Sequence, residues 1–152
     1  MAYKISPANN LHIDSIKSLL LDNELPVDDI ANEDLNFFLA FDEKTLIGVI
    51  GIEEYGETCL LRSLAVNDAY KGMGVGKHLL GYFLDYCKKN GFQVIYLLTT
   101  TADQYFLKYD FIRVDREDVP ESIQTTSQFK DICPSTAVVM KRVLDLKNAL
   151  SG

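Results

Sequence analysis

Apolar residues near the start of the chain recur at helical spacing. Between Ile13 and Leu20 they return every three or four positions, as on the buried face of an amphipathic helix. Asn9 or Asn10 stands at the start of this segment, where an asparagine side chain can cap a helix. The pattern predicts a helix over residues 9–22.

A second short helix and a group of strands follow. Pro26 and the acidic pair Asp28–Asp29 indicate a helix N-terminus, since acidic side chains are favourable there. Apolar runs at 37–41, 46–52 and 59–66 are separated by short polar segments. Runs of this length between turn residues predict an antiparallel meander of strands.

The most regular periodicity lies in the middle of the chain. Val75, Leu79, Phe83 and Cys87 recur every four residues and form one apolar stripe. Asn90-Gly91 follows, and glycine commonly ends a helix. The stripe predicts a long amphipathic helix.

The remaining segments complete an alternating order of strands and helices. The pattern predicts a strand at 94–98, a short helix at 102–109, a strand at 111–114, an irregular polar segment at 115–135, a strand at 136–144 and a frayed tail. The run at 94–98 is apolar throughout, which is typical of a parallel strand buried on both faces. We therefore predict one α/β domain over residues 1–152, with the crossover from Val66 to Val94 as its βαβ unit. Its mixed, mostly antiparallel sheet should have about six to seven strands covered by about four helices.

Charge and cysteine content restrict the partners. The chain has 152 residues and a formal net charge of −7, so most of its surface would repel a nucleic-acid duplex. No apolar run approaches the roughly 18 residues that span a bilayer, and the first ten residues lack the apolar core of a secretory signal. Cys59, Cys87 and Cys133 are too widely spaced to indicate a disulfide framework or a metal site. We predict a cytoplasmic protein with free thiols and with no metal, membrane or nucleic-acid partner.

A cluster of glycines precedes the long helix. Glycine occupies alternate positions in Lys71-Gly72-Met73-Gly74-Val75-Gly76-Lys77, although each glycine inside a helix costs about 1 kcal/mol relative to alanine. Unpaired N–H groups at a helix start favour a pyrophosphate ligand. A Walker A loop would need glycine at Lys71 and a hydroxyl at His78, and the dinucleotide fingerprint lacks its third glycine. A tight turn without a ligand is the alternative.

This spacing resembles the coenzyme A loop of the GNAT N-acetyltransferases. Their signature, Gln/Arg-x-x-Gly-x-Gly/Ala, is similar to Lys71–Gly76, with lysine in the first place. Ser63–Val66 resembles the family's fourth strand, and Ala102, Phe106 and Asp110-Phe111 resemble its later "Ala…Tyr…Gly-Phe" stretch. The resemblance covers nearly the whole chain in element order. It implies the GNAT acyl-CoA N-acyltransferase fold.

A narrower resemblance is to GNAT proteins found beside arsenic-resistance genes. It rests on Leu61–Val66, Tyr96–Ala102 and Cys133–Ser135, the last following Thr125 and Phe129. Such an association would not by itself identify a substrate.

The family resemblance implies an acetyl-CoA-dependent N-acetyltransferase that moves the acetyl group directly to a small-molecule amine. The backbone N–H groups of Lys71, Gly72, Met73, Gly74, Val75, Gly76 and Lys77 would hold the pyrophosphate. Backbone groups of Leu64, Ala65 and Val66 would pair with the pantetheine arm and the thioester carbonyl, and Thr99, Ala102 and Phe106 would line its other side. An N–H aimed at that carbonyl oxygen would stabilise the charge that develops there.

The chain departs from the family at the expected proton donor. The tyrosine that many GNAT enzymes use to protonate the coenzyme A thiolate is replaced by Phe106, and the glycine of "Gly-Phe" by Asp110. Phenylalanine has no proton to donate. The neighbouring Tyr105 is the candidate acid, with water or the substrate as alternatives. One helical step turns its side chain by roughly 100° from that of Phe106, so a surface or core aromatic is the other interpretation of Tyr105.

Arg62 is the candidate acceptor-binding residue. Related acetyltransferases often have glutamate there, and arginine is suited to bind an anionic oxygen. We expect Arg62 to share a strand face with Leu64 and to lie near Gly51. An anionic acceptor such as an amino acid or analogue is one interpretation. A salt bridge to Glu53, Glu54 or another acid is the other.

The sequence assigns no general base. Glu53 and Glu54 are candidates by position, whereas His12 and His78 suit solvated surface positions. The polar loop containing Thr125, Thr126, Cys133 and Ser135 could shape an acceptor pocket. A catalytically weak acyl-CoA-binding sensor is therefore the alternative function, and a homodimer is compatible with either function.

Overall fold

The computed structural model describes residues 3–9, 12–25, 27, 35–126 and 137–144. The chain groups into two compact units. The first comprises Met1–Glu53 and Arg62–Tyr86, and the second comprises Glu54–Leu61 and Cys87–Gly152.

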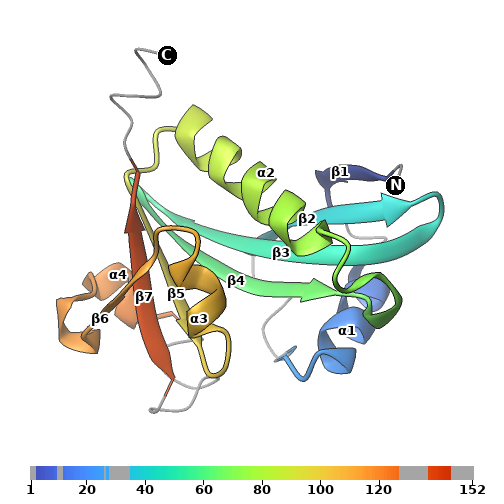
Figure 1. Ribbon diagram of the computed structural model, residues 1–152. Coiled ribbons are helices and arrows are strands. Elements are labelled where there is room, and N and C mark those ends of the chain that lie inside the picture. The colour runs from blue at the N-terminus through green and yellow to red at the C-terminus, as the bar shows by residue number, and fades with distance from the viewer. Residues whose placement is uncertain (1–2, 10–11, 26, 28–34, 127–136, 145–152) are drawn as a thin grey trace. The chain divides into compact units, whose positions relative to one another are not determined.

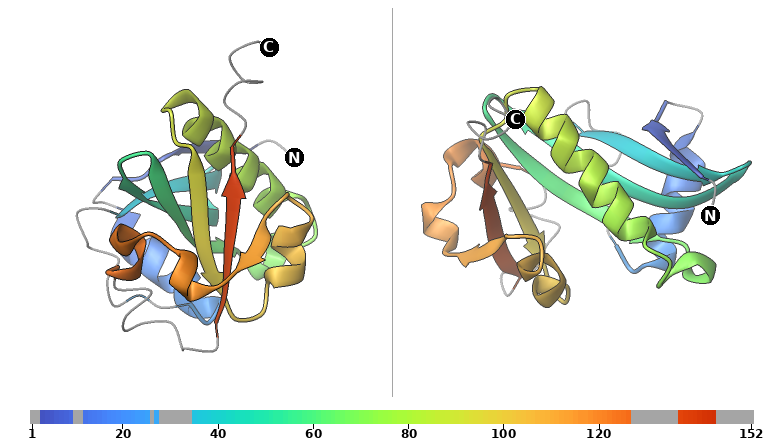
Figure 2. Two further views of the ribbon diagram at one scale, coloured as in Figure 1. Left: turned by 90° about the vertical axis from the view of Figure 1, so that its left-hand side faces the viewer. Right: turned by 45° about the horizontal axis from the view of Figure 1, so that its top comes forward.

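The first unit is an antiparallel sheet with a helix on each face (Figures 1 and 2). Its elements are β1 (Lys4–Pro7), α1 (Ile13–Asp22), β2 (Leu35–Asp42), β3 (Thr45–Tyr55), the later part of β4 (Thr58–Val66), η2 (Asp68–Tyr70) and most of α2 (Val75–Lys89). The strand order β1-β2-β3-β4 follows the sequence, and both β1–β2 and β2–β3 pair antiparallel. The predicted meander is therefore confirmed for β2 and β3.

Alternating side chains of β2 and β3 bury both faces of this sheet. On one face, α1 contributes Ile16, Leu19 and Leu20 to a core with Leu35, Phe37, Leu39, Val49 and Ala65. On the other face, α2 packs its apolar stripe, in which Val75, Leu79 and Phe83 are buried. A sheet that is covered on both sides explains why β3 is almost continuously apolar.

Gly48 sets how closely α2 approaches β3. A Cβ atom at Gly48 would lie 2.7 Å from Leu79 Cδ1 and 2.9 Å from Val75 Cγ1. Both neighbours are buried, so they have little room to move away. The first turn of α2 therefore rests directly on the backbone of β3.

The second unit is built around a mixed ladder. Its elements are the start of β4, β5 (Val94–Thr99), α3 (Asp103–Leu107), β6 (Ile112–Val114), η3 (Arg116–Asp118), α4 (Glu121–Gln124) and β7 (Val138–Val143). Thr58–Leu60 pairs parallel with Val94–Tyr96, which confirms the predicted βαβ crossover. β7 pairs antiparallel with both β5 and β6. Leu60, Tyr96, Val119, Ile123 and Val139 form a buried cluster of this unit.

Among the residues that the structure describes, seven strands follow the order β1-β2-β3-β4-β5-β7-β6. This mixed sheet, with the four α-helices found in the described part of the chain, is the arrangement expected of the GNAT fold. The fold class predicted from the sequence is confirmed.

Among the described residues, the sequence missed four short elements, β1, η2, η3 and α4, and misplaced one helix start. β1 was not predicted, because Lys4–Pro7 is polar and largely exposed. η3 and α4 lie in the segment predicted to be irregular, and each is only one turn long. The first helix begins at Ile13 with His12 as its N-cap, not at Asn9.

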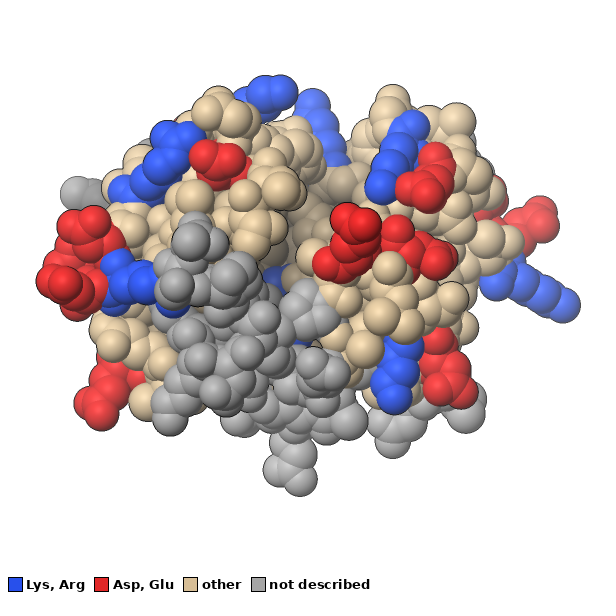
Figure 3. Space-filling view, turned by 90° about the horizontal axis from the view of Figure 1, so that it is seen from below, with Lys and Arg blue, Asp and Glu red and all other residues tan. Residues whose placement is uncertain are grey.

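Some sequence predictions lie outside the described residues. These are the cap at Asn10, the short helix after Pro26 with Asp28–Asp29, the segment with Phe129, Cys133 and Ser135, and the tail after Leu144. Within the described part of the chain, no helix is both long and apolar enough to cross a membrane. Figure 3 shows acidic and basic side chains interspersed on the face that it displays, among the residues drawn in colour.

Substituting Gly48 should test the contact between α2 and β3. Gly48→Ala places a methyl group against Val75 and Leu79, and we expect a loss of about 1–3 kcal/mol in the free energy of unfolding. Gly81→Ala is the matched control, because a Cβ at that exposed position in α2 meets nothing within 4 Å. It should stabilise the helix by about 0.5–1 kcal/mol. Urea unfolding measures both, and equal effects would contradict the close packing at Gly48.

Candidate functional site

The glycine loop, residues Lys71–Gly74, turns the chain into α2. Gly72 has φ of 80° and Gly74 has φ of 85°, a region that side chains with a Cβ rarely adopt. A Cβ at either position would meet nothing within 4 Å. Glycine is thus required here by backbone conformation and not by crowding within the protein, and the space beside the loop is open to a ligand.

The loop leads directly to the positive end of α2. His78 N donates to Gly74 O at 3.0 Å, and the N–H groups of the preceding first turn have no acceptor within the helix. The first turn of α2 contains no acidic residue that could neutralise this end. Val75 is buried and anchors the turn, whereas Met73 is 55% exposed. The arrangement suits an anion, and a phosphate in particular.

Lys71 stands where the family signature has glutamine or arginine. Its Nζ lies 2.8 Å from Asp68 Oδ1, and both side chains are more than half exposed. An ion pair as exposed as this contributes little to stability. Lys71 can therefore exchange Asp68 for a bound anion at small cost.

Strand β4 departs from regular geometry just before the glycine loop. Ser63 has φ of 59°, which is uncommon for a residue other than glycine. The parallel ladder with β5 ends at Leu60 and Tyr96, although β4 continues to Val66. The period-two alternation that predicted a shared face for Arg62 and Leu64 is thus interrupted at Ser63.

The other residues that the family resemblance implicates lie in the second unit. Thr99 Oγ1 accepts a hydrogen bond from Ala102 N at 2.9 Å, next to the start of α3. Phe106 is buried on α3, with its ring centroid 5.5 Å from that of Phe111. The sequence predicted a helix at the place of α3. The buried position of Phe106 on this helix suits an apolar ring.

Tyr105, the candidate acid, is half-buried beside another tyrosine. Its ring centroid lies 5.1 Å from that of Tyr109. Burial, followed by the charge and hydrogen bond of Tyr109, raises the pKa of Tyr105 to about 12. The phenol therefore keeps its proton throughout the neutral and mildly alkaline range.

Arg62 is engaged in a buried ion pair. Its Nη1 donates to Glu53 Oε2 at 3.0 Å, and the two side chains are 0% and 2% exposed. Its Nε donates to Ser63 Oγ at 3.2 Å, and its backbone O would lie 3.1 Å from a Cβ at Gly51. The salt bridge to Glu53, one of the two interpretations of Arg62 drawn from the sequence, is present. Arg62 also lies near Gly51, as expected, although it is the backbone oxygen of Arg62 that approaches this glycine.

The candidate bases differ in exposure and contacts. Glu53 is buried with Arg62, and Glu54 is half-buried. His78 is exposed and accepts or donates a hydrogen bond with the Tyr3 hydroxyl. His12 is partly exposed, with its ring centroid 5.3 Å from that of Phe41, and its Nδ1 accepts a hydrogen bond from Asn9 N.

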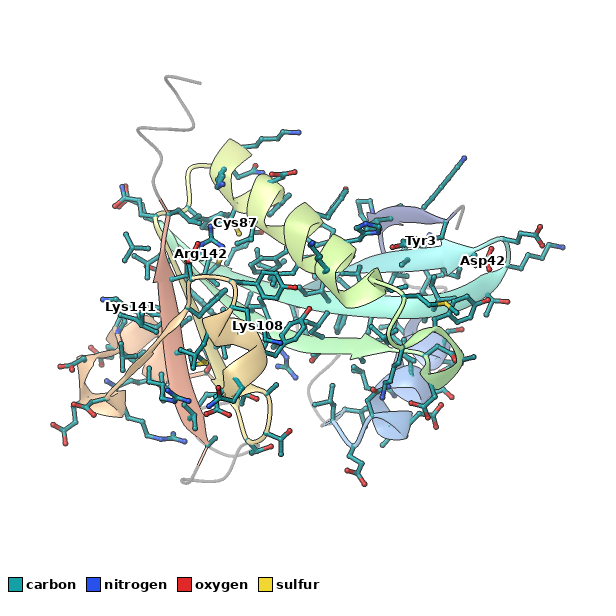
Figure 4. All side chains as sticks on the ribbon, viewed as in Figure 1. Tyr3, Asp42, Cys87, Lys108, Lys141 and Arg142 are labelled. Carbon is teal, nitrogen blue, oxygen red and sulfur yellow. The ribbon has the colours of Figure 1, made fainter. Side chains whose placement is uncertain are left out.

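Two cysteines that are distant in sequence lie together in the second unit. Cys59 Sγ and Cys87 Sγ are 3.6 Å apart and buried, and both are free thiols. The hydrogen bond to Cys87 and burial raise the pKa of Cys59, which disfavours the reactive thiolate. In Figure 4, Cys87 lies on the C-terminal part of α2.

The polar loop predicted to shape an acceptor pocket is only partly described. Thr125 Oγ1 and Thr126 Oγ1 donate to the carbonyl oxygens of Ser122 and Ile123 at the end of α4. Cys133 and Ser135 lie outside the described residues. Among the residues that are described, no three His, Cys, Asp or Glu side chains gather as metal ligands would.

Comparison with known proteins places this geometry in a family. Residues 9–109 match the acetyltransferase (GNAT) family. The chain belongs to this family. The matched region contains the glycine loop, β4, β5 and α3, so the family resemblance seen in the sequence is confirmed.

Individual relatives of this GNAT chain are distant. It is 36% identical over 64 residues to probable N-acetyltransferase 14 of Xenopus tropicalis, a match of 41% of this chain that spans only 31% of that protein. A GNAT acetyltransferase structure from Staphylococcus aureus Mu50 is 22% identical, with a TM-score of 0.79 and coverage of 95% of this chain and 100% of that one. N-acetylglutamate synthase from Neisseria gonorrhoeae, crystallised with coenzyme A and N-acetyl-glutamate, is 17% identical, with a TM-score of 0.80 and coverage of 95% of this chain and 35% of that one. These structural matches show the fold.

Breaking the buried ion pair of this GNAT protein should be costly. Arg62→Ala leaves Glu53 buried without its guanidinium partner, and we expect a loss of about 3–5 kcal/mol in the free energy of unfolding. The double variant Arg62→Met/Glu53→Gln removes both charges and should lose less than Arg62→Ala. Chemical denaturation measures these differences.

The control is the exposed pair of Arg113 and Asp103, 2.7 Å apart. Arg113→Ala should cost much less than Arg62→Ala, because solvent screens an exposed pair. Equal losses for the two arginines would contradict a structural role for Arg62.

Proposed function

We propose that this chain binds acetyl-CoA through the glycine loop and transfers the acetyl group to a small-molecule amine. The observation that carries the proposal is the pair of left-handed glycines, Gly72 and Gly74, with open space beside them. They stand immediately before a helix whose first turn lacks an acidic side chain. Membership of the GNAT family supports the assignment to an acetyltransferase.

The residues present fit a pyrophosphate. Backbone N–H groups of Lys71–Lys77 would hold it, because the absence of side chains at Gly72 and Gly74 lets phosphate oxygens approach the main chain. Acetyl-CoA would supply the acetyl group as an activated thioester. Several GNAT structures similar to this chain contain coenzyme A, among them the synthase from Neisseria gonorrhoeae and Rv2747 from Mycobacterium tuberculosis.

Strand β4 would hold the next part of the cosubstrate. We propose that backbone groups of Leu64, Ala65 and Val66 pair with the pantetheine arm, since this segment lies beyond the end of the β4–β5 ladder. A backbone N–H there would stabilise negative charge on the thioester oxygen. The contributions of Thr99, Ala102 and Phe106 to lining the arm remain predictions from the family resemblance.

For the acceptor of the acetyl group we propose only a chemical class. A small anionic amino acid or analogue would explain an arginine at position 62, and the Neisseria synthase was crystallised with such a compound, N-acetyl-glutamate. The pairing of Arg62 with Glu53 argues for a structural role instead. Acceptor binding by Arg62 would require the guanidinium to contact the acceptor while it retains Glu53.

A catalytically weak acyl-CoA-binding sensor is the second candidate. Phe106 occupies the position of the family's proton donor, and Glu53, a candidate base, is already paired with Arg62. Release of free thiol from acetyl-CoA with a library of amino compounds separates the two functions. Binding of coenzyme A without turnover on any acceptor would favour the sensor.

Several broader expectations stay proposals. They are one domain over residues 1–152, a cytoplasmic location, a homodimer and a link to arsenic-resistance genes. The last rests on the similarity of short segments alone. None of them enters the experiments on the glycine loop.

Alanine substitutions in the glycine loop test the binding site. Gly72→Ala and Gly74→Ala each place a Cβ where φ is positive, at a cost of roughly 1–2 kcal/mol, and put a methyl group in the space proposed for the phosphates. We expect coenzyme A to bind at least about tenfold more weakly to either variant, a change of about 1.4 kcal/mol or more in calorimetry.

Gly56→Ala is the matched control, because Gly56 also has positive φ, of 67°, and open surroundings. It lies in the turn between β3 and β4. It should lower stability similarly but leave the affinity for coenzyme A unchanged. Absence of any binding by the unmodified protein at millimolar coenzyme A would contradict the proposed function.

Tyr105→Phe tests the candidate proton donor. If the phenol protonates the leaving thiolate, kcat should fall about 10²-fold or more. Because the pKa of Tyr105 is raised to about 12, the donor stays protonated and its contribution should not titrate below about pH 11. Tyr109→Phe is the control and should retain most activity. An unchanged kcat in Tyr105→Phe would assign the proton to water or to the substrate.

A further inference from the structure

A tyrosine just before the glycine loop is tied to the β2–β3 hairpin. Tyr70 OH donates a hydrogen bond to Asp42 Oδ2 at 2.9 Å. Asp42 is the last residue of β2 and pairs with Thr45 across the hairpin turn, at the tip labelled in Figure 4. Tyr70 is the last residue of η2, one position before Lys71.

The same short segment is also fixed to the hairpin by its backbone. Asn67 N donates to Ile47 O on β3 at 2.8 Å. The Asn67 side chain accepts from Ala69 N at 3.0 Å, and Tyr70 N donates to Asn67 O at 2.8 Å. These bonds fix both the direction of η2 and the place at which it begins.

The other end of the glycine loop rests on the hairpin as well. Val75, the first residue of α2, is buried against Gly48 of β3. Between these two anchors lie only Lys71–Gly74, which are all exposed. Gly72 and Gly74 give this stretch more conformational freedom than any other residue type would. The direction of its N–H groups therefore depends on where the two ends are held.

We infer that the hydrogen bond from Tyr70 to Asp42 positions the glycine loop for pyrophosphate binding. The inference rests on the proposed function and adds positioning residues that need not touch the ligand. A loop already held in its binding conformation loses less entropy when the ligand binds. Without the hydrogen bond, the binding-competent conformation is a smaller fraction of the population, and the apparent affinity falls by that fraction.

The bond could instead serve only the stability of the fold. A purely structural role would lower the melting temperature of Tyr70→Phe and leave the affinity of the folded protein for coenzyme A unchanged. A positioning role lowers the affinity with little change in melting temperature, since the hydroxyl is partly exposed. Affinity and stability thus separate the two roles.

The first experiment compares Tyr70→Phe with Tyr82→Phe. Tyr82 lies on α2 in the same unit, and its ring packs on Phe38 at a centroid distance of 5.1 Å. Calorimetry with coenzyme A should show a Kd about five- to tenfold higher for Tyr70→Phe and an unchanged Kd for Tyr82→Phe. Hydrogen exchange in free Tyr70→Phe should be faster at the amides of 71–77 than in the unmodified protein.

A second pair of variants tests the acceptor of the bond. Asp42→Ala removes the oxygen that Tyr70 contacts, whereas Asp42→Asn keeps an amide oxygen able to accept from the phenol. Asp42→Ala should weaken binding as much as Tyr70→Phe, and Asp42→Asn should restore most of the affinity. The double variant Tyr70→Phe/Asp42→Ala should bind no more weakly than either single variant, because the same bond is lost in all three.

The outcomes separate the two proposals. If the unmodified protein fails to bind coenzyme A, the proposed function is wrong and the positioning role falls with it. If the unmodified protein binds and Tyr70→Phe binds equally well, the positioning role alone is overturned, whatever its melting temperature. Additive losses in the double variant would also overturn it.

Discussion

The turn from β4 into α2 is the constraint on which the proposed site depends. The chain must reverse from the end of a strand into a helix within a few residues, and it does so through two glycines at positive φ. Side chains would strain this path, and they would also cover the N–H groups that the helix start presents. One backbone requirement thus produces both the turn and an open, electropositive surface suited to phosphate. The close approach of α2 to β3 at Gly48 holds this surface in place.

Polar groups near the turn serve different purposes according to their burial. The pair of Arg62 and Glu53 is fully buried, so each charge depends on the other to remain in the interior. Lys71 and Asp68 are exposed, and solvent already stabilises both, which leaves Lys71 able to contact a ligand. The ion pair between β3 and β4 therefore has a structural role, whereas the ion pair of Lys71 can be replaced by a contact with a ligand.

The second unit combines aromatic packing with buried thiols. Phe106 and Phe111 form an apolar contact next to the half-buried Tyr105, so the position that the family resemblance assigns to a proton donor is part of the core. Cys59 and Cys87 meet although 28 residues separate them, because β4 and the end of α2 come together in this unit. The hydrogen bond to Cys87 and burial raise the pKa of Cys59, and the buried position of both thiols suits a role in packing.

The sequence alone determined the fold class, most of the elements and the glycine loop. Those features have local causes, because each depends on residues that are close together in the sequence. They are the apolar stripe of α2, the apolar runs of the strands and the glycines at 72 and 74. The sequence missed β1 and α4, since segments as short as Lys4–Pro7 and Glu121–Gln124 carry no periodic pattern. β1 is ordered by pairing with β2, and α4 by burial of Ile123 in the core of the second unit. Tertiary structure alone decided that Arg62 pairs with Glu53, that Ser63 interrupts β4 and that Tyr70 reaches Asp42. The physical reason is that hydrogen bonds and ion pairs act over about 3 Å, and only the folded chain brings such partners within that distance.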